Sequence, residues 1–148
     1  MSARPAVALL CSLLLVAAVA ASAAAPTPSL GIKLQDPSTD PSIANMRIVL
    51  DHKTIKPGRV TLHAENQSKN LVHEVIIVRD DGAKELPMDA KHARVIESRV
   101  RRLGEISDLA AGKSGSLTVN LKPGNYVLFC NQPGHYQEGM FATLTVAP

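Results

Sequence analysis

Residues 126–146 read YVLFCNQPGHYQEGMFATLTV, with apolar residues gathered at both ends and polar residues in the middle. Apolar and β-branched residues in this arrangement predict two strands, Tyr126–Cys130 and Met140–Val146. Between them, Pro133 and Gly134 are typical of a loop, because both residues favour turn conformations. This part of the sequence therefore predicts a strand–loop–strand unit.

Three residues with metal-binding side chains lie at the two ends and in the middle of the predicted loop: Cys130, His135 and Met140. They are spaced five residues apart. A thiolate, an imidazole and a thioether form a soft ligand set, and such sets suit copper. Taken singly, each residue has an ordinary explanation: a buried inert thiol, a loop histidine and a methionine that fills the core. Their order within so short a segment favours a metal site.

A second imidazole would complete the blue-copper ligand set of two histidines, one cysteine and a weak methionine. The candidate is His73, which lies in the strongly apolar stretch 71–78, a predicted buried strand. Val75 and Ile77 alternate with it on the same face, so the imidazole points toward the core and needs a polar or metal partner. A core histidine with an ordinary hydrogen-bond partner is the alternative. The pattern predicts one copper ion with four ligands, His73, Cys130, His135 and Met140.

The rest of the chain shows short alternating apolar segments separated by turns that contain proline or glycine. Further strands are predicted at residues 30–34, 46–51, 60–65 and 117–121. Short strands at this spacing indicate an all-β sandwich or barrel. A length of 148 residues fits a single domain.

Residues 80–103 have the weakest pattern in the chain. Pro87 permits a short helix through residues 88–94, and apolar residues at 93, 96, 100 and 103 have helical spacing. A strand over residues 98–106 is equally compatible with the sequence. We therefore expect one short helix or an irregular insertion around residues 87–103.

The first 25 residues have the three-part pattern of a secretory signal peptide: a basic start at Arg4, an apolar run over 6–20 and small residues at 21–25. A membrane-anchoring helix is the alternative, although the apolar run is short for a span. We expect a signal peptide at residues 1–24, an N-terminal extension with the first strand at 25–45 and a copper-binding domain at 46–148. The protein would then be periplasmic, with no stable membrane insertion after cleavage.

Cleavage reduces the cysteine count from two to one, because Cys11 leaves with the signal peptide and Cys130 remains. A single thiol in an oxidising compartment must be buried, paired with another chain or held by a metal. The formal net charge of +3 falls to +2 without Arg4. So small a charge does not indicate nucleic-acid binding.

The segments Tyr126–His135 and Gly139–Phe141, together with Asn70–His73, resemble the ligand regions of cupredoxins. These are the small blue copper proteins related to plastocyanin and azurin. The Cys-x4-His-x4-Met spacing is most similar to that of rusticyanin and of sulfocyanin-like members. The resemblance implies a Greek-key β-sandwich with copper at one end, and copper-binding roles for the four predicted ligands.

One position departs from the family pattern. Many cupredoxins have asparagine or serine directly after the first ligand histidine, where its hydrogen bond helps to link the two ligand-bearing loops. This chain has Glu74 there. The departure puts the usual link in doubt and favours a Glu74 side chain that faces solvent or pairs with a basic residue.

The ligand set and the resemblance together imply an exported one-electron carrier and not an enzyme. We expect a monomer whose partner is a redox protein such as a cytochrome or a copper enzyme, with electrons leaving at the edge of His135. The alternative is a periplasmic protein that binds and delivers copper in homeostasis or resistance. A copper oxidase or nitrite reductase would need further histidine clusters, and the chain has no His-x-His motif.

Two groups of charged or titratable residues remain, a basic cluster and three histidines that we expect at the surface. One group is a basic cluster, formed by Arg94, Arg99, Arg101 and Arg102. It is either an ordinary solvated face or a surface that steers an acidic redox partner, because such charges mainly change association rates. The other group consists of three histidines in polar or alternating contexts, His52, His63 and His92.

Overall fold

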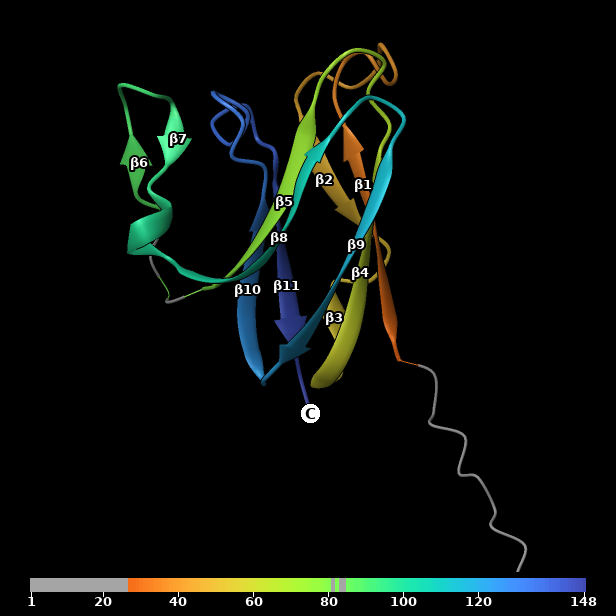
Figure 1. Ribbon diagram of the computed structural model, residues 1–148, viewed down its shortest axis with the longest axis vertical. Helices are drawn as coiled ribbons and strands as arrows, with labels where there is room; N and C mark the ends of the chain where they lie inside the picture. The colour runs from red at the N-terminus through yellow and green to blue at the C-terminus, as the bar shows by residue number, and fades with distance from the viewer. Residues whose placement is uncertain (1–26, 81, 83–84) are drawn as a thin grey trace, which may run out of the picture.

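Two β-sheets pack face to face in the computed structural model, which describes residues 27–80, 82 and 85–148 (Figure 1). The first sheet contains β1 (Ser29–Gln35), β2 (Arg47–Leu50), β4 (Gly58–Asn66) and β9 (Ser114–Leu121), in the order β2-β1-β4-β9. The second contains β3 (Thr54–Ile55), β5 (His73–Arg79), β8 (Arg101–Leu109), β10 (Gly124–Phe129) and β11 (Phe141–Val146), in the order β3-β11-β10-β5-β8. The predicted all-β sandwich is confirmed.

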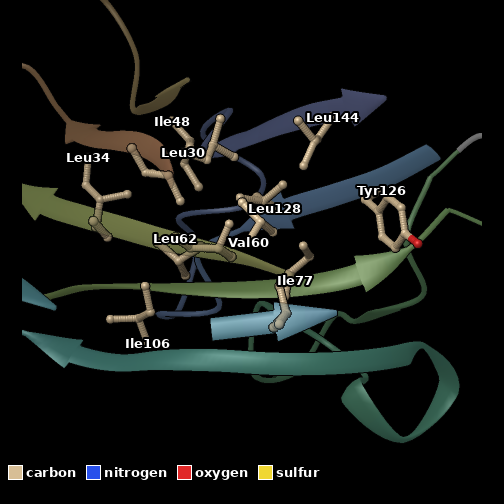
Figure 2. Close-up of a cluster of buried hydrophobic side chains, with 14 of the residues drawn as sticks. Leu30, Leu34, Ile48, Val60, Leu62, Ile77, Ile106, Tyr126, Leu128 and Leu144 are labelled. Atoms are coloured by element: carbon tan, nitrogen blue, oxygen red, sulfur yellow. The ribbon is translucent and has the colours of Figure 1, made fainter. Parts of the chain in front are cut away.

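Alternation of apolar and polar residues forms the core between the sheets, as the sequence pattern predicts. On β4, Val60, Leu62 and Ala64 are buried, whereas His63 between them is exposed. Figure 2 shows Leu62, Leu128 and Ile77, from three different strands, among the side chains of this core. Each predicted strand is present, and the short β3 is an additional strand that the sequence pattern did not predict.

Strand β5 is buried on both faces, which explains its continuous apolar sequence. Its inward residues Val75 and Ile77 join the main core. Its outward residues Ile76 and Val78 pack with Phe129 in a second apolar cluster, which also contains Val95. The outer face of this sheet is therefore covered by the segment that follows β5 in the chain.

That covering segment contains a two-stranded ribbon, β6 (Met88–Asp89) and β7 (Arg94–Val95), and one turn of 3-10 helix, η1 (Glu97–Arg99). The expected irregular insertion is confirmed, but the helices considered over 88–94 and 93–103 are wrong. Met88 and Val100 instead pack against the outer face of the second sheet. Strand β8 (Arg101–Leu109) overlaps the strand that the alternative predicted over residues 98–106. Figure 1 shows β6 and β7 beside the loop that connects β10 to β11.

The strand order brings distant parts of the chain to one end of the sandwich. Strand β10 pairs antiparallel with β5, with Phe129 opposite Ile76, and with β11, with Phe129 opposite Phe141. The start of β5, the end of β10 and the start of β11 therefore meet. His73, Cys130 and Met140 occupy these three positions.

The predicted signal peptide, residues 1–24, lies outside the described residues. Within the described part of the chain, no helix is long and apolar enough to cross a membrane.

Candidate metal centre

The side chains of His73, Cys130 and His135 converge at the end of the sandwich. The Nδ1 atoms of the two histidines are 3.2 Å apart, and Cys130 Sγ lies 4.0 Å from Nδ1 of His73 and 3.4 Å from Nδ1 of His135. All three atoms lie within 4.8 Å of one another, so these residues form a possible metal site. One of them comes from β5 and the other two from the β10–β11 loop.

Burial controls the protonation of this group. His73 and Cys130 are fully buried and His135 is half-buried. Burial lowers the pKa of both imidazoles, for His73 despite the opposing effect of Asp36, so both rings are neutral and can act as ligands. Burial also raises the pKa of the Cys130 thiol to about 11, so a bound metal would have to displace its proton.

Backbone hydrogen bonds close the ligand loop on itself. The N–H of Cys130 donates to the carbonyl of Met140 over 3.1 Å, and the N–H of Met140 donates to the carbonyl of His135 over 3.0 Å. Gly134 and Gly139 adopt positive φ angles of 84° and 93°, which other residues rarely adopt. The loop thus holds all three of its sequence-predicted ligands in one backbone unit.

Met140 is fully buried and belongs to the same apolar cluster as Cys130. Its backbone bonds to Cys130 and His135 place it directly beside two members of the ligand group. A buried thioether at this place is compatible with a weak metal ligand and also with core packing.

Glu74 does not face solvent or pair with a basic residue, so that expectation is wrong. Its side chain is buried, and its carboxylate Oε1 accepts the N–H of Asn131 over 3.0 Å. Burial, and secondarily the charge of Glu105, raises the pKa of Glu74 to about 6. Both faces of β5 are covered, so a side chain opposite the main core is still enclosed. Glu74 therefore links the ligand loop to the strand that carries His73.

The backbone of Glu74 and the side chain of Asn131 extend this link. The N–H of Glu74 donates to Cys130 Sγ over 3.5 Å. The side chain of Asn131 accepts the N–H of Val95 over 2.7 Å and donates to the carbonyl of Val95 and to Glu97 Oε1. The β6–β7 ribbon is thereby hydrogen-bonded to the residue that follows Cys130. Sequence reasoning missed Asn131, whose one signal is its position next to Cys130.

Asp36 is a second residue that sequence reasoning missed, because its proline-rich surroundings are typical of an ordinary loop. It is fully buried, and its Oδ2 lies 2.9 Å from Nε2 of His73. Burial raises the pKa of this carboxyl, but hydrogen bonds from Ser38, Ser68 and His73 outweigh burial and hold it well below its usual range. Asp36 is thus an ionised acceptor for the neutral imidazole of His73.

The three remaining histidines lie at the surface, as expected. Each remaining histidine is exposed and hydrogen-bonded to a neighbour away from the metal group: His63 to Ser116 over 2.7 Å, His92 to Asp89, and His52 to Asp51. Within the basic cluster, Arg102 pairs with Glu97 and Glu105 over 2.8 and 2.9 Å.

Comparison with known proteins agrees with this geometry. The family model described as "Copper binding proteins, plastocyanin/azurin family" matches residues 38–147. The chain belongs to this family. The cupredoxin resemblance of its ligand segments and the copper-binding prediction are therefore confirmed, with His73, Cys130 and His135 as a possible metal site.

Individual relatives of this cupredoxin include auracyanins and rusticyanin. Auracyanin-B of Chloroflexus aurantiacus is 54% identical over 41 residues, a match that covers 27% of this chain and only 17% of the relative's length. Reduced auracyanin from Roseiflexus castenholzii has a similar structure, with a TM-score of 0.57, 23% identity, and coverage of 84% of this chain and 99% of that chain. Rusticyanin from Thiobacillus ferrooxidans gives a TM-score of 0.60 at 19% identity, with 82% and 77% covered.

The link through Glu74 predicts a difference between two substitutions. Glu74→Ala removes the acceptor for the buried N–H of Asn131 and should lower the free energy of unfolding by about 1–3 kcal/mol. Glu74→Gln retains a carbonyl acceptor at the same place and should lose less. Urea unfolding of the metal-free variants measures both values, and equal losses would show that the hydrogen bond does not stabilise the loop.

Proposed function

We propose that this cupredoxin is an exported one-electron carrier that binds a single copper ion through four ligands, His73, Cys130, His135 and Met140. The observation that carries the proposal is the convergence of two neutral imidazoles and one buried thiol within 4.8 Å. When bound, copper supplies one-electron chemistry by alternating between Cu(I) and Cu(II). Auracyanin A, a structural relative with a TM-score of 0.56, is described as a "blue" copper protein.

The donor set fits copper better than the other common metals. Two imidazoles and a thiolate form the plane of a blue copper site, and a buried methionine beside them supplies the weak fourth ligand. Zinc would also accept imidazole and thiolate ligands, but it gains nothing from a thioether. Met140 is therefore the residue that favours a copper site over a zinc site.

Rigid support of the ligands favours electron transfer, because little rearrangement is then needed between the two redox states. Glu74 holds the N–H of Asn131, and Met140 holds the N–H of Cys130. Asp36 holds the far nitrogen of His73. His73 is thus fixed by a carboxylate outside the ligand group, and backbone hydrogen bonds hold Cys130, His135 and Met140 relative to one another, as pre-organised sites require.

The partner surface is proposed at His135. This imidazole is half-buried, whereas His73 and Cys130 are fully buried. Two large apolar residues next to proposed ligands are exposed. Val72, directly before His73, is 42% exposed, and Phe141, directly after Met140, is 45% exposed. A redox protein such as a cytochrome or a copper enzyme would dock here, since an apolar contact excludes water between the two centres. Arg94, whose charge acts on His135, would favour an acidic partner.

The same proposal includes the cellular setting and the division of the chain. We propose that residues 1–24 direct export to the periplasm and are removed, that residues 25–45 form the N-terminal extension with the first strand, and that residues 46–148 form the copper-binding domain. The lone mature thiol, Cys130, would then persist in an oxidising compartment because it is buried and metal-bound.

The main test is the visible spectrum of the purified protein with Cu(II). A cysteine thiolate bound to copper should give an intense blue band, and Cys130→Ser should abolish it. His63→Ala, which removes an exposed histidine, is the control and should leave the band unchanged. A colourless copper complex of the wild-type protein would contradict the proposed site.

The role of Met140 makes a separate prediction. Met140→Leu should retain copper but raise its reduction potential, because an apolar side chain replaces a weak electron-donating ligand. Met88→Leu, in the ribbon, is the matched control and should leave the potential unchanged. Voltammetry measures both values. A wild-type potential in Met140→Leu would show that this methionine is not a ligand.

The carrier can be separated from a copper-delivery protein by kinetics. Stopped-flow mixing of the oxidised protein with a reduced cytochrome should show fast electron exchange with full retention of copper. Transfer of Cu(I) to a chelator should be slow, because three of the four proposed ligands are fully buried. Rapid Cu(I) release together with slow electron exchange would favour delivery instead.

A further inference from the structure

Both ring nitrogens of His73 have a defined partner: Nδ1 faces the possible metal site, and Nε2 faces the carboxylate of Asp36. Nε2 lies 2.9 Å from Oδ2 of Asp36, and the two side chains are 0% and 1% exposed. Asp36 follows β1 in the first sheet, whereas His73 begins β5 in the second. The contact therefore joins the two sheets directly behind the proposed ligand.

We infer that Asp36 is a positioning residue of the copper site, which fixes Nδ1 of His73 as the metal-facing atom and places a negative charge one imidazole ring away from it. The inference rests on the proposed copper-binding function. A carboxylate accepts hydrogen bonds but donates none, so Nε2 must carry the proton and Nδ1 is left with a free lone pair. Such a carboxylate also makes the imidazole a stronger electron donor.

Asp36 is itself held in place from both sides. Its Oδ1 accepts the N–H of Ser38 over 2.7 Å and also the hydroxyl of Ser38. That hydroxyl contacts the hydroxyl of Ser68 over 3.1 Å, and Ser68 in turn accepts the N–H of Leu71 over 2.9 Å. The β1–β2 loop is thus bonded to the segment that leads into His73. The carboxylate cannot turn away without breaking several of these bonds.

Burial of a carboxylate is costly unless partners compensate for the lost water. The loop anchor uses only Oδ1, which accepts both hydrogen bonds from Ser38, whereas Oδ2 is turned to His73. A negative charge has a specific consequence at this place, because it stabilises the more positive oxidised state of the site. Asp36 should therefore lower the reduction potential and strengthen copper binding.

The first measurement needs no metal. Nitrogen NMR of the imidazoles in the metal-free wild-type protein should show His73 as the Nε2–H tautomer. Observation of the Nδ1–H tautomer would overturn the inference. Because this result does not depend on copper, it still tests Asp36 if the blue band fails to appear and the proposed function is wrong.

The second measurement compares Asp36→Asn with Asp40→Asn in the copper-loaded protein. Asp40 lies in the same loop, is exposed and is hydrogen-bonded to Ser42. Asp36→Asn should raise the reduction potential and weaken copper binding by about 10- to 100-fold, whereas Asp40→Asn should change neither. Loss of folding stability with an unchanged potential and affinity would reduce Asp36 to a loop anchor.

If Asp36→Asn does not fold, Ser38→Ala tests the same inference. This substitution removes one hydrogen bond to the carboxylate and leaves its charge in place. The potential should shift only slightly, while the His73 tautomer should stay unchanged. If Ser38→Ala gave a mixture of His73 tautomers but kept the wild-type reduction potential, the tautomer of His73 would not affect the potential. That result would contradict the inference.

Discussion

The antiparallel pairing of β5 with β10 is the contact on which the site depends. It places Phe129 opposite Ile76, so the residue after Phe129 and the residue at the start of β5 meet at the same edge. Side chains alternate between faces, so a shift of one residue would turn every side chain of β5 to the opposite face. Burial on both faces of β5 makes such a shift costly, because Ile76 and Val78 have their own apolar cluster. The core packing therefore sets the ligand positions.

The same pairing forces polar groups into a place where water cannot reach them. Three buried polar side chains surround the ligand group: Asp36, Glu74 and Asn131. Within the described residues, no buried side-chain nitrogen or oxygen lacks a hydrogen-bond partner. A buried polar network gives rigidity when it is complete and is destabilising when it is incomplete. The site thus gains its fixed geometry from two complete sets of hydrogen bonds, one around Asp36 and His73 and one around Glu74 and Asn131.

Sequence reasoning succeeded where the information is local. The ligand loop has its cysteine, histidine and methionine within one segment. The strands are likewise predicted from the alternation of apolar and polar residues within a few neighbouring positions. It failed where a residue's role depends on what covers it. Glu74 was expected at the surface because the ribbon that encloses it comes from a segment without a clear pattern. Asp36 is separated from His73 by 37 positions, and nothing in its own loop indicates that the loop closes over the site.

The two imidazoles of the site have different surroundings, and this difference agrees with different roles for His73 and His135. His73 is fully enclosed and bonded to a carboxylate, so its environment is isolated from solvent and from any partner. His135 is half-buried in a loop whose neighbours Pro133 and Phe141 are exposed. A partner that docks at the loop would desolvate His135 but leave the Asp36–His73 pair untouched. The electrostatic setting of the site is thus established inside the sandwich, whereas contact with the proposed partner would take place at a separate surface.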